Sequence, residues 1–155
     1  MSEQLYWENV TAGQELPILL KTPSTQQLVK YAGASGDFYQ IHYDKDFAIN
    51  KGLPSVIVHG ALKSAFLAQL LTDWVGTRGS LKKLSIQYRG MDVPDDPLTC
   101  RGIVTRKYQV GNDCLVDCEI WIENSQGQTT TPGTATVMLP SHAVSYTHLT
   151  LPTKA

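Results

Sequence analysis

The stretch Gly60-Ala-Leu-Lys-Ser-Ala-Phe-Leu-Ala-Gln-Leu-Leu-Thr-Asp-Trp-Val75 predicts a long helix around which the rest of the chain would fold. Its apolar residues fall on nearly every side of a helix, and Gly76 follows directly as a terminating residue. Because a helix that is apolar around its circumference has to be covered by other elements, we expect it to be deeply buried. The apolar positions are Leu62, Ala65, Phe66, Ala68, Leu70, Leu71 and Trp74.

After this helix the hydrophobic pattern changes to a period of two, which is typical of strands with one buried face. Gly111-Asn112 is a hairpin signal, and two further clusters of turn residues separate the strands. A long buried helix followed by a meander of antiparallel strands predicts an α+β domain whose curved sheet wraps around the helix. The expected strands cover 81–89, 98–109, 114–122 and 135–139.

A short strand over 15–21 and two helices are expected before the central helix. Thr22 reads as the N-cap of the first of these helices, with Pro23 at the first helical position and an end near Ala32. Asp44 is the expected N-cap of the second, short helix. The buried side of the first helix should carry Leu28, Val29 and Ala32.

Composition excludes several classes of protein. The 155 residues predict one domain over 1–140, and a formal net charge of -1 gives no electrostatic reason to expect nucleic-acid binding. No apolar run approaches the roughly 20 residues that cross a bilayer, so we expect no membrane partner. The beginning of the chain lacks the basic and apolar regions of a secretory signal, which favours a cytoplasmic location.

The three cysteines, Cys100, Cys114 and Cys118, are odd in number and lack the spacing of metal ligands. Cys114 and Cys118 fall on one side of the same expected strand, roughly 13 Å apart at about 3.3 Å per residue, which is too far for a disulfide. We therefore expect all three to be reduced residues packed in the core.

The segment Ala-Ser-Gly36-Asp37-Phe-Tyr-Gln-Ile-His42-Tyr-Asp carries the chemistry. It places an acid and an imidazole five residues apart, and Gly33 and Gly36 weaken any helix that precedes the acid. On a loop, the Asp37 and His42 side chains can converge on one small molecule. From the residues alone, Asp37 also fits a turn and His42 a structural histidine, so both alternatives stay open at this point.

This motif, the following His59-Gly60-Ala61 and the order of elements resemble the MaoC-type (R)-specific enoyl-CoA hydratases over residues 5–140. The resemblance implies the hotdog fold, a homodimer, and a substrate that is an acyl thioester of CoA or of acyl carrier protein. It implies no separate cofactor and no metal. Two positions depart from the family pattern: Tyr39-Gln40 replaces Asn-Pro, and Ala61 replaces the methionine of His-Gly-Met.

By the same resemblance, Asp37 and His42 hold and activate the water that adds to a 2-enoyl thioester. The backbone N–H of Gly60 stabilises the developing enolate oxygen, since a helix N-terminus favours negative charge. Substrate contacts are expected from His59, Ala61 and Tyr39. We expect His59 to brace the loop through hydrogen bonds rather than to titrate in the reaction.

Two other functions stay open from the sequence. One is a non-catalytic hotdog subunit that binds an acyl chain or acts as a scaffold in a larger enzyme complex, although a scaffold needs neither Asp37 nor His42. The other is a hotdog thioesterase, for which the acid–histidine motif has no evident use.

Residues 141–155 are expected to be a tail outside the domain. The run Val144 to Thr153 resembles the in-frame translation of a transposase-type sequencing-library adapter, and a short natural tail is the alternative. Its few apolar residues show neither a helix period nor a strand period, so we expect this segment to be disordered and assign it no function.

Overall fold

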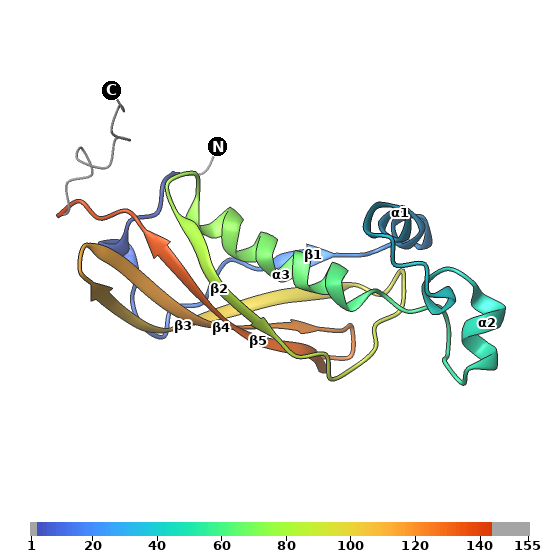
Figure 1. Cartoon of the computed structure of the whole chain (residues 1–155). Helices are drawn as coiled ribbons and strands as arrows, with labels where there is room; N and C mark the ends of the chain where they lie inside the picture. Colours follow the sequence, from blue (N-terminus) through green and yellow to red (C-terminus); the bar gives the residue numbers. More distant parts are fainter. Residues whose placement is uncertain (1–2, 144–155) are drawn as a thin grey trace, which may run out of the picture.

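A curved antiparallel sheet with one long helix along its face forms the body of the molecule (Figure 1). The computed structural model describes residues 3–143. The sheet has the strand order β1-β3-β4-β5-β2, and the α+β prediction is confirmed. Its strands are β1 (Leu19–Lys21), β2 (Ser80–Ile86), β3 (Leu98–Val110), β4 (Asp113–Glu123) and β5 (Thr129–Leu139). The helices are α1 (Thr25–Ser35), α2 (Lys45–Asn50) and α3 (Gly60–Val75), with single 3-10 turns η1 (Trp7–Asn9) and η2 (Gln40–His42).

Two hairpins join the three long strands where turn residues predicted them. Gly111 turns β3 into β4 and Gly127 turns β4 into β5, both with positive φ angles, of 60° and 77°. Positive φ is the conformation that glycine adopts at no steric cost. The predicted period of two in β4 is confirmed, since every second residue is buried: Cys114, Val116, Cys118, Ile120 and Ile122.

The central helix α3 begins and ends as predicted, but it is not covered on nearly all sides. Ala61 and Ala65 are exposed in this chain, because the sheet covers only one side of the helix. Phe66, Leu67 and their apolar neighbours on the covered side join the core. That side also carries one charged residue, Lys63, which is only 2% exposed.

The prediction for α1 is wrong at both ends. Ser24 is the N-cap in place of Thr22, because the Ser24 hydroxyl accepts a hydrogen bond from the Gln27 N–H at 3.1 Å. The helix continues past Ala32 to Ser35 and ends only at Gly36, which has a φ of 77°. The flexibility of a single interior glycine, Gly33, is therefore outweighed by the rest of the helix.

Three smaller expectations also differ from the structure. Val29 is 55% exposed, whereas Leu28 and Ala32 are buried as predicted. The expected strand over 15–21 is reduced to β1, since only those three residues pair continuously with β3 and Glu15 forms an isolated bridge. Strand β2 ends at Ile86, so the following residues to 89 lie beyond it and form a loop.

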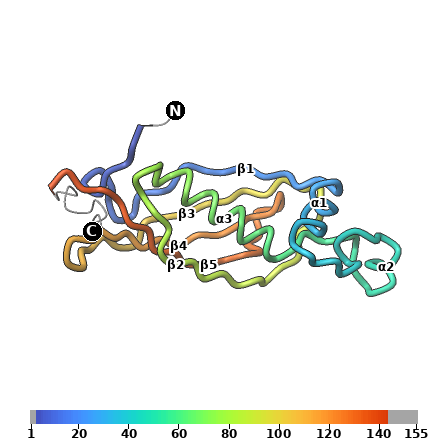
Figure 2. Tube along the Cα trace, turned by 45° about the horizontal axis from the view of Figure 1, so that its top comes forward, coloured from blue at the N-terminus to red at the C-terminus, as the bar shows by residue number. Residues whose placement is uncertain are grey.

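The short elements α1, η2 and α2 lie together beyond one end of the sheet, next to the first turn of α3 (Figure 2). The first and last described segments lie at the opposite end (Figure 2). None of the helices within residues 3–143 is long and apolar enough to cross a membrane. Because α1, η2 and α2 lie next to the first turn of α3, the Asp37–His42 motif that they carry lies at the N-terminus of the central helix.

The beginning of the predicted tail contacts the domain. The Ser141 hydroxyl donates to a Glu8 carboxylate oxygen at 2.9 Å, and the His142 ring stacks on Tyr6 with centroids 3.7 Å apart. Residues 144–155, including the adapter-like run, lie outside the described residues. Their expected disorder stays a prediction.

The three cysteines are free and buried within the sheet. Burial raises the pKa of both Cys100 and Cys118 to about 12, because the thiolate loses its hydration in the core. We therefore expect these thiols to resist a thiol-specific reagent at about pH 8 in the native protein and to react fully after denaturation. Rapid labelling of the native protein, followed by mass spectrometry, would contradict this expectation.

Candidate active site

The structure brings Asp37 and His42 together. Asp37 Oδ2 lies 3.8 Å from His42 Nε2, with the Asp37 side chain half exposed and the His42 side chain nearly buried. The other ring nitrogen of His42, Nδ1, lies 2.7 Å from the carbonyl oxygen of Ile57. A carbonyl only accepts, so Nδ1 carries a proton and Nε2 of the neutral ring is left as an acceptor facing Asp37. At 3.8 Å, the two facing atoms are too far apart for a direct hydrogen bond but close enough to share one water.

Local turns set the position of the Asp37 carboxylate. The left-handed Gly36 ends α1 and turns the chain away from the helix axis. Asp37 Oδ1 then accepts from the Tyr39 N–H at 3.4 Å, as in an Asx turn, while the Ser35 hydroxyl accepts from the Asp37 N–H at 3.2 Å. One carboxylate oxygen thus holds the loop, and the other is left to face His42.

The backbone of η2 and α2 orients His42 from the other side. The His42 N–H donates to the Tyr39 carbonyl at 3.1 Å within η2. Asp44 is the N-cap of α2, as predicted, and its carboxylate accepts from the Phe47 N–H at 3.1 Å. The motif therefore carries its own turn and cap residues around the acid–histidine pair.

His59 braces the site through its ring faces. Its ring stacks on the His42 ring with centroids 3.8 Å apart and meets the Tyr31 ring edge to face at 4.7 Å. The residue is fully buried. Packing between rings thus braces the loop, and the expected bracing by hydrogen bonds stays a prediction.

Gly60 is the first residue of α3, so its N–H is among the helix amides that have no partner within the helix. It borders a cavity of about 350 Å³ that His42 also lines. A Cβ on Gly60 would lie 3.0 Å from the Tyr88 ring, which makes glycine the residue that fits here. The remaining lining residues are Ile57, Val58, Lys63, Tyr88, Arg89, Gly90 and Met91.

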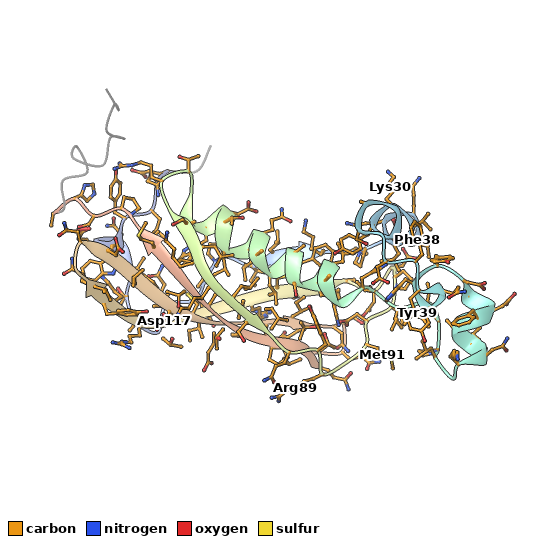
Figure 3. The ribbon with its side chains drawn as sticks, viewed as in Figure 1. Lys30, Phe38, Tyr39, Arg89, Met91 and Asp117 are labelled. Atoms are coloured by element: carbon orange, nitrogen blue, oxygen red, sulfur yellow. The ribbon has the colours of Figure 1, made fainter. Side chains whose placement is uncertain are left out.

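Of the two other residues expected to contact the substrate, Tyr39 lies near His42, whereas Ala61 lies away from the cavity. Tyr39 is half exposed and presents its ring edge-on to His42 at 6.4 Å between centroids. Figure 3 shows Tyr39, Phe38 and Met91 at the same end of the molecule, with Asp117 far along the sheet. Ala61 lies on the exposed side of α3 and does not line the cavity.

Larger hollows exist elsewhere, without the same chemistry. Two of about 490 and 590 Å³ lie along β2, β4 and β5, on the sheet face that carries Asp117 and Glu119. Neither is lined by a histidine or by a residue of α3, although the first shares Arg89 with the cavity at Gly60. The smaller cavity at Gly60 is therefore the better candidate, because it joins a cleft to an acid–base pair and unpaired helix amides.

Asp37, His42 and His59 also form the one group of possible metal ligands within residues 3–143, with donor atoms within 4.8 Å of one another. The two imidazole rings are stacked at only 20° with centroids 3.8 Å apart, so their lone pairs lie in two nearly parallel, separated planes. A tetrahedral metal site needs lone pairs that converge at about 2.0–2.1 Å. The arrangement therefore fits acid–base chemistry better than metal binding.

The sequence interpretation missed a buried ion pair beside the cavity. Lys63 Nζ lies 3.0 Å from Asp92 Oδ2, and both side chains are almost fully buried. A signal was present, since Lys63 shares the spacing of Phe66, Leu67 and Leu70 on the apolar side of α3. A lysine on such a side needs a buried partner.

The pKa of His59 is lowered from its ordinary value of 6.5, first because of burial and then because of the neighbouring charge of His42. The unfolded chain therefore binds a proton at His59 that the native protein does not. As the pH falls through 6.5, the free energy of unfolding should decrease, and this contribution should be fully present above that pH. In a His59→Phe variant, which keeps an aromatic ring against His42, the decrease should be smaller. Urea unfolding at a series of pH values measures the free energy of unfolding of the unaltered protein and of the variant. An equal decrease in the two proteins would disprove the contribution of His59.

Comparisons with known proteins find relatives of the whole chain and of part of it. The chain is 28% identical to the (R)-specific enoyl-CoA hydratase of Rhodospirillum rubrum over 143 residues, which cover 88% of this chain and 92% of the relative. It is 34% identical over 87 residues to a fatty acid synthase beta subunit of Gibberella zeae. That match covers 55% of this chain but only 4% of the much longer subunit.

A solved structure shows the same fold. The (R)-hydratase from A. caviae, described as involved in PHA biosynthesis, is 25% identical with a TM-score of 0.76, covering 86% of this chain and 99% of that chain. The curved five-stranded sheet around α3 is thus the hotdog fold, as predicted. The model of the MaoC-like domain family matches residues 7–124. The chain therefore belongs to the MaoC-like domain family.

Proposed function

We propose that this protein catalyses the reversible hydration of trans-2-enoyl thioesters to (R)-3-hydroxyacyl thioesters. The observation that carries the proposal is the 3.8 Å separation between Asp37 Oδ2 and His42 Nε2 beside the cavity that Gly60 borders. The similarity to an (R)-specific enoyl-CoA hydratase over most of both chains supports this reaction and this stereochemistry.

Asp37 and His42 act on a single water. The water oxygen forms the new bond to C3 of the substrate while one of its protons passes to the acid–histidine pair. The pair returns a proton to C2, so the sum is the addition of one water without a redox step. His42 can accept the proton at Nε2 because its Nδ1–H is held by the Ile57 carbonyl. Positioned acid–base groups of this kind typically raise the rate of a reaction by about 10²–10⁴-fold.

Gly60 stabilises the negative charge that develops on the thioester oxygen. Its N–H lies at the N-terminus of a 16-residue helix, where the aligned peptide dipoles favour an anion. An amide at this position strengthens its hydrogen bond as the carbonyl becomes an enolate, which lowers the barrier. This role needs no side chain, and a Cβ at this position would press against the Tyr88 ring at 3.0 Å.

The rim of the site fits an apolar substrate. Phe38, Tyr39 and Met91 are large apolar residues, each at least half exposed, at the end of the molecule that holds the motif (Figure 3). CoA and acyl carrier protein both carry the acyl chain as a thioester, so the proposal includes substrates on either carrier. The homodimer stays a prediction, and β1 and β2 are the two edge strands of the sheet.

A hydration assay tests the proposal. Crotonyl-CoA, longer trans-2-enoyl-CoAs and one acyl carrier protein thioester are incubated with the protein, and the configuration of the 3-hydroxy product is determined. We expect turnover to the (R) product. Hydrolysis of the thioester without hydration would indicate a thioesterase. Tight binding without turnover would indicate a non-catalytic acyl-binding subunit, and either result would refute the proposal.

A further inference from the structure

We propose that Lys63 is a positioning residue that sets the distance between the Gly60 amide and the opposite cavity wall formed by residues 88–91. The inference rests on the proposed function, because the wall would place the thioester carbonyl against that amide. It assigns a role to the buried Lys63–Asp92 pair, which has no part in the acid–base chemistry of Asp37 and His42.

Lys63 joins the first turn of α3 to the wall through two contacts. Its ammonium donates to the Gly90 carbonyl at 3.0 Å and to Asp92 Oδ2 at 3.0 Å. The ammonium also lies 5.9 Å from the centre of the Tyr88 ring. A lysine loses its hydration when it is this deeply buried, so these partners have to be held in place for the charge to be tolerated.

Asp92 connects the wall to two further parts of the fold. Its Oδ2 accepts from the Thr130 hydroxyl at 2.7 Å, which fixes it to β5. Its backbone carbonyl accepts from the Val58 N–H at 2.8 Å, in the segment that leads into His59 and Gly60. Asp92 thus holds the wall, the sheet and the approach to the α3 N-terminus in one arrangement.

Thr130 fixes the wall a second time. Its carbonyl accepts from the N–H groups of Arg89 and Gly90, each at 2.9 Å. The wall is therefore attached rigidly to β5, and Lys63 is its buried attachment to α3. The Ser64 hydroxyl and the Tyr88 hydroxyl form a second, exposed link between the same two elements.

The position of Lys63 on α3 explains why it should affect the amide. Residues three apart lie on the same side of a helix, so Lys63 and Gly60 both face the cavity that they line. A change at Lys63 alters the spacing between the amide and the wall without touching Asp37 or His42. Since the amide bonds most strongly to the enolate, a misplaced wall should lower kcat more than it changes KM.

The test removes the pair as a unit. In the double variant Lys63→Met with Asp92→Asn, neither charge is left unpaired, so the fold should persist as judged by its thermal midpoint. We expect kcat to fall about tenfold or more, with KM changed by less than about threefold and an unaltered pH profile of kcat. The exposed Lys82→Met serves as the matched control and should leave both constants unchanged.

A second variant covers the case in which the double variant does not fold. Lys63→Arg keeps the charge but enlarges the group between α3 and the wall, and it should lower kcat to a similar extent. Normal kcat in a folded variant of either kind overturns the inference, as does a loss that appears equally in Lys82→Met. The unaltered protein is assayed in parallel, because its failure to turn over any enoyl thioester would refute the proposed function instead.

Discussion

Asp37→Asn and His42→Ala should each lower kcat for the best 2-enoyl thioester by about 10²-fold or more. The neutral amide introduced by the first change cannot serve as a base, and the second removes the acceptor nitrogen that lies 3.8 Å from the carboxylate. Steady-state hydration kinetics with each purified variant measure the effect. The double variant should be little slower than the slower single variant, because both groups act on the same water.

Controls separate this loss from a loss of structure. Asp46→Asn changes another exposed acid, on α2, and should leave kcat within about twofold of the unaltered protein. Circular dichroism and the thermal midpoint should show that the Asp37 variant is folded, since its side chain is half exposed. If a folded Asp37→Asn or His42→Ala variant retained nearly normal turnover, the residue in question would have no place in the mechanism.

Gly60→Ala should lower kcat by about 10–10²-fold while KM changes little. The added methyl group would lie 3.0–3.1 Å from three atoms of the Tyr88 ring, so either the ring or the first turn of α3 must move. The hydroxyl of that ring is hydrogen-bonded to Ser64, which resists movement of the ring. A displaced amide then bonds the enolate oxygen less well, and steady-state kinetics measure the loss.

The matched control for this variant is Gly33→Ala. Gly33 also lies within a helix, and a Cβ there would have nothing within 4 Å, so the substitution should leave kcat unchanged and stabilise α1 slightly. Adding Tyr88→Leu to Gly60→Ala should recover part of the lost kcat, because the smaller side chain makes room for the methyl group. Equal kinetics for Gly60→Ala and Gly33→Ala would contradict the prediction that the added methyl group displaces the Gly60 amide.

Elements that depend on nearby residues could be predicted from the sequence. The bounds of α3 follow from an apolar run that begins at a glycine and ends before Gly76, and those of β4 follow from a strict period of two. Asp44 was recognisable as a cap because its side chain bonds an amide only three residues away. The Asp37–His42 motif was visible for the same reason, since the loop that joins the two residues is short.

Contacts between distant segments were decided by the tertiary structure. Whether Val29 faces the core depends on how α1 sits against the rest of the fold. The Ser24 cap, by contrast, is a local contact to an amide three residues away, like that of Asp44, and the sequence interpretation misplaced it by two residues. The stacking of His59 on His42 arises only because the N-terminus of α3 meets the motif loop in space.

The α+β class, the central helix, the hairpins and the acid–histidine motif could therefore be predicted from the residues alone, since each rests on period, turn or cap chemistry within a few residues. The tertiary structure decided the strand order, in which β2 pairs with β5 rather than with β3, and the partners of buried polar groups. Lys63 and Asp92 are 29 residues apart in the chain. Their pairing follows from the desolvation cost of a buried charge, which is known only once the packing shows that both are buried.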